Sequence, residues 1–425
     1  MQIPQQQKAP EGGATIELGS TARGVALLVC ATIFLLTGVL GVRGGYGTLL
    51  ATTMCVMLLL WRFSQQSLGA ILIFSATSLY LVPLISLIYV GLPVNVGLFA
   101  LFAITAYCMA SFGSRVEAMR PFETGGISAT ANFLAMTGML IVGLVAATET
   151  GTFGQPIFTG FVALALLHFE RLCWTQCSTL LRWVAMAIFA AVIGIYAAFL
   201  WDGFGRIVII SFLLLPVLIS ARYQLFRLSP LLLMAAGGLL VFVGRVLRFG
   251  VSEGISGIAV DSGATHLILS SELLASQAES TSGTSLFEQF QLFFLNWAPR
   301  EIWPGKPINI NSLFVDSYIG RGGLSEEHST ALGFFGEQIY LAGDMWLLTA
   351  VIAAVMTIAV RAIISRIAQP YYASVVAYDV WLVTLFWGGM ASFAARAWFA
   401  VIPLVAYAVF LKTWDVRHSK VSALS

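Results

Sequence analysis

The chain has 425 residues, of which 59% are apolar and only 10% are charged, and its formal net charge is +2 at pH 7. Soluble globular domains carry about 25% charged residues, so this composition excludes an ordinary soluble domain and indicates an integral membrane protein. The small net charge gives no reason to expect binding to nucleic acid. The five cysteines lie outside the long polar interval described below, so neither a disulfide framework nor a cysteine metal site is expected.

Apolar runs close to the length of about 20 residues that a helix needs to cross a bilayer recur along the chain. They predict an all-α integral membrane protein of about twelve transmembrane helices, with one long, late external loop that contains short or amphipathic helices. The predicted spans lie at 24–42, 45–61, 67–91, 93–112, 127–148, 152–169, 181–200, 204–220, 230–247, 345–364, 373–390 and 393–411.

The predicted organisation has five parts in chain order. Residues 1–22 are polar and rich in Gln, Pro and Gly, which predicts a disordered cytoplasmic tail. Transmembrane helices 1–9 occupy 23–248, the external loop occupies 249–343, transmembrane helices 10–12 occupy 344–411, and a second cytoplasmic tail occupies 412–425.

Lysines and arginines orient the predicted helices, because cytoplasmic connections carry an excess of them. With both termini in the cytoplasm, every predicted cytoplasmic connection carries at least one such base, and residues 249–343 lie outside. The bases on the cytoplasmic side are then Lys8, Arg23, Arg62, Arg115, Arg120, Arg171, Arg182, Arg222, Arg227, Arg361, Arg366, Lys412, Arg417 and Lys420.

The external loop holds half of the carboxylates and half of the histidines, so chemistry is expected to concentrate there. Residues 264–277 and 285–296 are predicted to be helical. The second helix gathers Phe290, Phe293 and other apolar side chains mostly on one face, which suits the outer headgroup layer of a bilayer. The same face could equally pack on other helices of the protein.

Cations on the external side form the candidate binding residues. In the loop, Arg300 and Lys306 alternate with prolines that fix the backbone, and Arg321 lies among glycines. Arginine can grip two phosphate oxygens at once, so such a group suits a pyrophosphate. The non-functional alternative for the cations near helix ends is that their side chains extend to lipid headgroups. The candidate pyrophosphate-binding residues are Arg206, Arg245, Arg300, Lys306, Arg321 and Arg396.

The pattern P-R-x-x-W-P-x-K-P, followed after a gap by G-x-x-G-E-x-Y-x-x-x-G, resembles the Wzy-type polymerases of O-antigen and exopolysaccharide repeat units. Arg206 at the start of the eighth span and the R-x-x-R-F-G at the end of the ninth, Arg245 to Gly250, are also similar to that family. The motif residues are Pro299, Arg300, Trp303, Pro304, Lys306, Pro307, Gly333, Gly336, Glu337, Tyr340 and Gly343.

The resemblance implies a multi-pass enzyme of the bacterial cytoplasmic membrane that joins polyprenyl-pyrophosphate-linked oligosaccharide repeat units on the outer face. The implied partners are that lipid-linked glycan, the bilayer, and possible accessory proteins, namely a chain-length regulator and a repeat-unit flippase. Cations would stabilise the departing pyrophosphate. No His, Asp and Glu set at metal-ligand spacing accompanies them, so neither a metal nor another cofactor is expected.

Two residues compete for the role of acceptor base, which takes the proton of the attacking hydroxyl. His328 has a convenient ordinary pKa near 6.5, whereas Glu337 lies between a glycine and an aromatic residue where the loop re-enters the membrane. Glu337 could instead cap or anchor the tenth span, and His328 could belong to a solvated loop. Both are kept as candidate catalytic residues.

Other functions remain open on the sequence alone. An O-antigen ligase, which passes a finished glycan to a lipid core, needs almost the same parts. A transporter or flippase would be expected to carry charged residues in helix centres and two similar halves, and neither is evident. A polyprenyl-dependent transferase of another type would place carboxylates in its first external loop, which has none. A structural scaffold would leave the cation and proline cluster unexplained.

Overall fold

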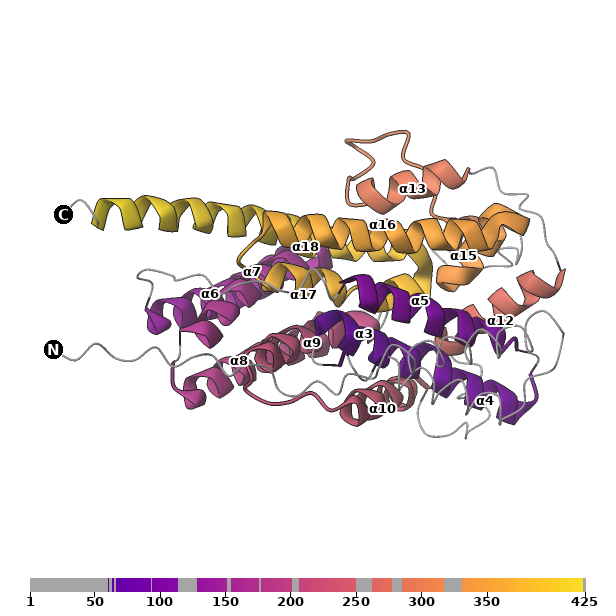
Figure 1. Ribbon diagram of the computed structural model, residues 1–425, viewed down its shortest axis with the longest axis horizontal. Helices are drawn as coiled ribbons and strands as arrows, with labels where there is room; N and C mark the ends of the chain where they lie inside the picture. Colours follow the sequence, from indigo (N-terminus) through magenta and orange to yellow (C-terminus); the bar gives the residue numbers. More distant parts are fainter. Residues whose placement is uncertain are drawn as a thin grey trace.

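The computed structural model of the protein describes residues 60, 63–64, 66–92, 94–113, 128–150, 154–175, 177–200, 206–249, 262–276, 285–316 and 331–422. Regular structure within these residues is helical, and most of the longer helices follow the long axis of the molecule (Figure 1). The elements are α3 (Ser67–Ser75), η2 (Ala76–Leu81), α4 (Val82–Val90), α5 (Gly97–Gly113), α6 (Ala129–Glu149), α7 (Gly154–Trp174), α8 (Thr179–Phe199), α9 (Arg206–Arg222), α10 (Pro230–Phe249), α12 (Ser262–Ser276), α13 (Leu286–Leu295), α14 (Ile310–Phe314), α15 (Gly333–Ala342), η6 (Gly343–Met345), α16 (Trp346–Ile367), α17 (Ala373–Asp379) and α18 (Leu382–Ser422).

Among the described residues, six helical stretches are long and apolar enough to cross a membrane. They are Ser67–Tyr89, Ala129–Glu149, Gly154–Trp174, Thr179–Phe199, Gly333–Ile367 and Leu382–Thr413. The prediction of an all-helical membrane protein agrees with these helices, and the number of spans stays a prediction. The predicted spans 24–42 and 45–61 lie outside the described residues.

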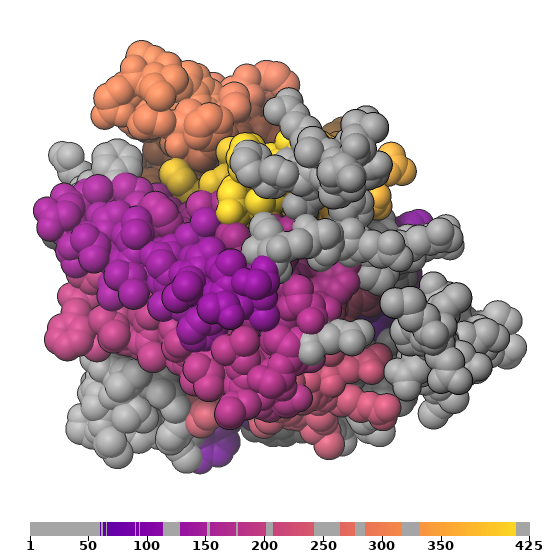
Figure 2. Space-filling model, turned by 90° about the vertical axis from the view of Figure 1, so that its left-hand side faces the viewer, coloured from indigo at the N-terminus to yellow at the C-terminus, as the bar shows by residue number. Residues whose placement is uncertain are grey.

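Exposed apolar side chains cover the helices at one end of the molecule. Figure 2 shows this end, where α6, α7 and α8 occupy much of the surface. Leu134 and Val145 of α6 and Leu180 and Phe199 of α8 are between 56% and 81% exposed. Single apolar side chains are common on soluble surfaces, but rows of this kind on apolar helices suit contact with lipid chains.

The predicted short helices of the long loop are confirmed. Residues 264–277 correspond to α12, and residues 285–296 correspond to α13, which begins with a capping box between Ser285 and Glu288. The packing alternative holds for part of the amphipathic face, and its contact with headgroups stays a prediction. Phe293 is buried against α18, whereas Phe287 and Phe294 are exposed.

The centre of the molecule is the segment 371–386, in which every residue is buried. Other helices surround this segment, since α17 packs against α3, α7, α9 and α16. In Figure 1 this segment lies among the other helices, below α16. It leads directly to the break in α18.

Candidate functional site

The chain reverses direction inside α18, at Gly388 and Gly389. Gly389 has a φ of 79° and a ψ of −172°, which lies outside the helical region and is accessible chiefly to glycine. The ring of Tyr378, before the break, lies 5.2 Å from the ring of Phe393, after it. Tyr378 belongs to α17, so α17 and the part of α18 after the break lie side by side. The separate spans 373–390 and 393–411 stay predictions.

Glu337 of α15 holds the first residue after the break. Its side chain is fully buried, and its Oε2 accepts a hydrogen bond of 2.7 Å from the backbone N–H of Met390. A Cβ atom at position 389 would collide with the Glu337 carboxylate, so this glycine permits both the backbone conformation and the close approach. Within the described part of the chain, Glu337 Oε1 has no hydrogen-bond partner.

Two asparagines bind the backbone on either side of Met390. Asn311 of α14 donates from Nδ2 to the carbonyl oxygen of Gly388 over 2.8 Å, and its Oδ1 accepts from the N–H of Leu332. Asn296, directly after α13, donates from Nδ2 to the carbonyl oxygen of Ala391 over 2.8 Å. Successive residues of the break are therefore fixed by side chains from three different helical segments.

Lys306 forms hydrogen bonds that fix the backbone before the proline-rich segment. Its Nζ donates to the carbonyl oxygens of Asn296 and Ala298 over 2.6 and 3.0 Å, which uses two of the three ammonium donors. Burial, followed by the charge of Arg300, lowers the pKa of Lys306. Lys306 thus ties its own segment to the end of α13, where Asn296 contacts the break.

Arg300 is the exposed cation of this segment. Its Nη1 donates to the carbonyl oxygen of Lys306 over 2.9 Å, and its side chain is otherwise on the surface. Arg396 lies two turns beyond Gly389 and is half-buried. Its Nη1 donates to the carbonyl oxygen of Ser392, and its Nε has no partner among the described residues.

The remaining predicted site residues are not described in side-chain detail. His328 and Arg321 lie outside the described residues. Arg206 begins α9 and Arg245 belongs to α10, but their side chains are likewise outside the description. The structure therefore brings Glu337, Lys306 and Arg300 into one connected region around the break, and the functional roles of all the candidate residues stay predictions.

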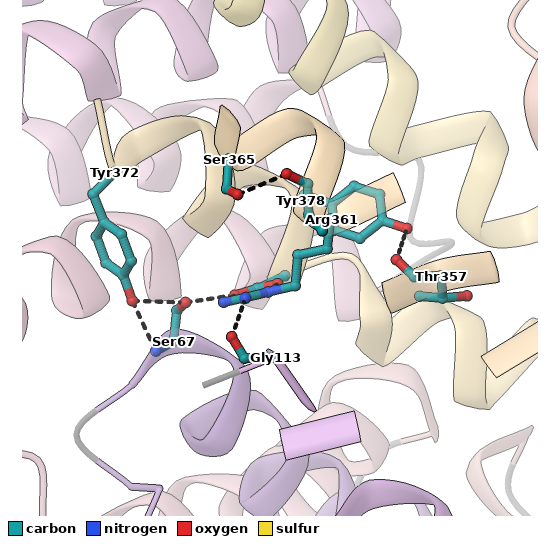
Figure 3. A network of polar contacts seen from close by, with 9 residues as sticks. Ser67, Gly113, Thr357, Arg361, Ser365, Tyr372 and Tyr378 are labelled. Atoms are coloured by element: carbon teal, nitrogen blue, oxygen red, sulfur yellow. Dashed lines mark hydrogen bonds and ion pairs between the residues drawn. The ribbon is translucent and has the colours of Figure 1, made fainter. Parts of the chain in front are cut away.

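A buried ion pair in the centre of the molecule was missed by the sequence analysis. Arg361 of α16, which had been counted among the cytoplasmic bases, is fully buried and binds both carboxylate oxygens of Asp379. Ser67 of α3 donates to Asp379 Oδ2, and the Tyr372 hydroxyl donates to Ser67 Oγ over 2.8 Å (Figure 3). One sequence signal was available, because a lone aspartate in the apolar run 373–390 requires a partner.

Glu170 of α7 caps the other end of the central segment. Its two carboxylate oxygens accept from the N–H groups of Tyr372 and Ala373, each over 2.8 Å, at the start of α17. The Tyr223 hydroxyl donates to Glu170 over 2.7 Å, and burial raises the pKa of Tyr223. A carboxylate at a helix N-terminus is favoured by the unpaired N–H groups and the helix dipole.

Glu337 differs from these two buried carboxylates in its surroundings. Asp379 faces a guanidinium, and Glu170 accepts three hydrogen bonds. In the part of the chain that the structure describes, Glu337 accepts one hydrogen bond and forms no ion pair. Burying an ionised carboxylate without a counter-charge is costly, so this arrangement suits a neutral carboxyl group that holds the break.

Comparisons with known proteins found no matching family model, no matching curated protein and no matching solved structure. The chemistry of the site is therefore argued from its residues. The arrangement offers an exposed guanidinium, a rigid proline-rich segment and a buried carboxyl group at a helix break, all joined by hydrogen bonds.

Proposed function

We propose that the protein joins oligosaccharide repeat units carried on a polyprenyl pyrophosphate, as a metal-independent glycosyltransferase of the bacterial cytoplasmic membrane. One observation carries the proposal. The two halves of the motif, which are separated in the sequence, are both linked to the same helix break. The second half contacts it directly, through Glu337 to Met390, and the proline-rich half is linked indirectly, because Lys306 binds the carbonyl oxygen of Asn296 and the Asn296 side chain donates to Ala391.

The proposed reaction transfers the growing glycan to the incoming unit. The bond between the anomeric carbon of the growing glycan and its pyrophosphate oxygen breaks, and a new bond forms between that carbon and a hydroxyl oxygen of the incoming unit. The hydroxyl proton passes to a base, and the polyprenyl pyrophosphate leaves as an anion. Fixed cations stabilise such a leaving group, because charge develops on it in the transition state.

The residues take different roles in this proposal. Arg300 is exposed and keeps most of its guanidinium donors for a phosphate, whereas Lys306 mainly fixes the segment. Glu337 is a positioning residue, since its carboxyl group is enclosed and holds Met390. The acceptor base is then His328, the more natural proton acceptor of the two candidates at neutral pH.

The decisive experiment supplies a purified lipid-linked repeat unit to the protein in detergent or liposomes. Polymer length and released polyprenyl pyrophosphate are measured for the natural protein and for Arg300→Ala, His328→Ala and Glu337→Gln. Arg366→Ala, which removes an exposed arginine of α16, is the matched control. Loss of turnover by roughly 10²–10⁴-fold in His328→Ala, with normal folding, supports the base assignment. Full activity in both Arg300→Ala and His328→Ala would remove these residues from the reaction.

The acceptor separates polymerase from ligase in the same assay. A polymerase extends a second repeat unit, whereas an O-antigen ligase requires a lipid core and gives no ladder of products with repeat units alone.

A transporter or flippase is the second candidate, because the structure supplies an observation that the sequence analysis lacked. Arg361 and Asp379 are charged residues buried inside the helical bundle, and such residues often mark transport pathways. Broken helices are also common in transporters. Movement of the lipid-linked unit across a liposome membrane, with no new glycosidic bond, would favour this candidate.

A further inference from the structure

An apolar groove lies between α7 and α18, in the part of α18 that follows the break. It has a volume of about 400 Å³ and is lined by Ile157 and Gly160 of α7, by Trp398, Phe399 and Pro403 of α18, and by Trp297. This volume falls in the range of about 300–1,000 Å³ that is usual for small-molecule sites. Both helices belong to candidate membrane spans, so the natural occupant is a hydrocarbon chain rather than water.

Gly160 of α7 faces α18 within the groove. A Cβ atom at position 160 would lie 3.4 Å from the carbonyl oxygen of Phe399 and 3.6 Å from Cγ of Pro403, which is ordinary contact distance. An alanine is therefore tolerated there, whereas a long side chain would have to extend along the groove. Position 160 is thus a means of filling the groove from within.

One end of the groove is tied to the candidate site. Trp297 stands between Asn296 and Ala298, the two residues whose carbonyl oxygens Lys306 holds, and three residues before Arg300. The indole of Trp398 donates to the carbonyl oxygen of Phe293 over 2.6 Å, which fixes the second tryptophan to α13. The lining of the groove therefore includes a residue of the same short segment as Arg300, the cation that the proposed function assigns to a pyrophosphate.

We propose that this groove holds the first isoprene units of the lipid carrier, those nearest its pyrophosphate. The inference rests on the proposed function, because it needs a lipid whose phosphate lies at Arg300. A lipid whose phosphate is held at Arg300 must place its first isoprene units on an apolar surface close by. The groove that includes Trp297 supplies such a surface. Tryptophans suit that boundary, since their rings are amphipathic.

The test fills the groove without touching the cations. A photoreactive polyprenyl monophosphate, with its reactive group in the first isoprene units, is bound to the full-length protein, and crosslinked peptides are mapped. Crosslinks are expected in α7 and α18, and Gly160→Leu should reduce them by roughly tenfold. Gly194→Leu is the matched control, because Gly194 lies on exposed α8 with nothing near its Cβ position.

A second pair of variants guards against misfolding. Ile402→Trp fills the groove from α18, and Val409→Trp adds the same bulk elsewhere on that helix. Equal crosslinking in Gly160→Leu, Ile402→Trp and the controls would overturn the proposal. So would displacement of the probe by ordinary phospholipid at equal concentration, because the groove would then hold a bilayer lipid without preference.

This experiment separates the groove from the proposed reaction. If the natural protein makes no polymer, but crosslinks map to the groove and the groove-filling variants abolish them, then the lipid site stands and the polymerase proposal is rejected. If the protein makes polymer, and Gly160→Leu changes neither the reaction with the long carrier nor that with an analogue of two or three isoprene units, then the polymerase stands and the lipid site is rejected. The proposal expects Gly160→Leu to raise the KM for the long carrier and to leave the short analogue unaffected.

Discussion

Arg361 binds both carboxylate oxygens of Asp379 with one edge of its guanidinium, with Nε to Oδ1 at 2.7 Å and Nη2 to Oδ2 at 2.9 Å, and both side chains are fully buried. The remaining Nη1 donates to the carbonyl oxygen of Gly113 over 2.9 Å. The pair therefore joins α16, the central segment and the end of α5.

Breaking this pair should destabilise the protein strongly. Asp379→Asn and Arg361→Ala each leave one partner buried without its counterpart, at a cost of about 3–5 kcal/mol. The measurement is the thermal unfolding midpoint in detergent, together with the yield of folded protein. Arg366→Ala on the same helix is the control and should behave like the natural protein, because Arg366 is exposed. A double variant of Arg361 and Asp379 should cost less than the sum of the single variants.

Glu337, at the break, should tolerate replacement of its neutral carboxyl group by an amide but not the loss of its acceptor oxygen. In Glu337→Gln the amide oxygen can still accept from Met390, so folding should be close to normal. Glu337→Ala leaves that N–H without a partner and should cost about 1–3 kcal/mol. The unfolding midpoints of the two variants decide the matter. Equal destabilisation by both would mean that an ionised carboxylate is required.

The glycine opposite that glutamate should resist substitution. Gly389→Ala places a Cβ atom on the Glu337 carboxylate and forces a non-glycine residue to a positive φ, so we expect a marked loss of folded protein. Gly138→Ala and Gly194→Ala are the controls, since their Cβ atoms meet open space. If the collision is the main cause, Glu337→Ala should partly restore the yield of Gly389→Ala.

The cap of the central segment should depend on its carboxylate. Glu170→Ala removes the acceptor of the Tyr372 and Ala373 N–H groups, at a cost of about 1–3 kcal/mol. Tyr223→Phe removes a single hydrogen bond to the same carboxylate and should cost about 1 kcal/mol. Hydrogen exchange at the start of α17 gives a local readout, and it should quicken in Glu170→Ala more than in Tyr223→Phe.

The two cations of the proline-rich segment should separate into different roles. Lys306→Ala frees the carbonyl oxygens of Asn296 and Ala298, so it should lower stability as well as turnover. Arg300→Lys keeps the charge but loses the planar fork, so it should impair turnover in the proposed reaction and leave the unfolding midpoint unchanged. A lower midpoint in Arg300→Lys and an unchanged one in Lys306→Ala would reverse these roles.

Much of the helical plan could be read from the sequence, because apolar length and helix signals are local. The helices at 264–277 and 285–296 were predicted from the local sequence. The break at Gly389 was not, because it lies inside the predicted span 373–390. Glu337 was recognised as important through its motif. Its partner could not be, since Met390 contributes only a backbone N–H, which no pattern of side chains reveals. Arg361 was counted among the cytoplasmic bases because it lies near the end of a predicted span. That position alone does not show whether an arginine is exposed or paired with a residue 18 positions away, as Arg361 is with Asp379.

The central segment 371–386 obtains its polar partners from helices that precede it in the chain: Glu170 at its start, Ser67 and Arg361 in its middle, and Glu337 and Asn311 beyond its end. These partners are therefore synthesised before the central segment, and until that segment is inserted their charges and hydrogen-bond donors lack the groups that satisfy them. A chain truncated before residue 371 would leave a carboxylate and a guanidinium unmatched inside the bilayer, which is costly. The C-terminal helices thus complete the assembly, and truncated chains should be the preferred substrates of membrane quality control.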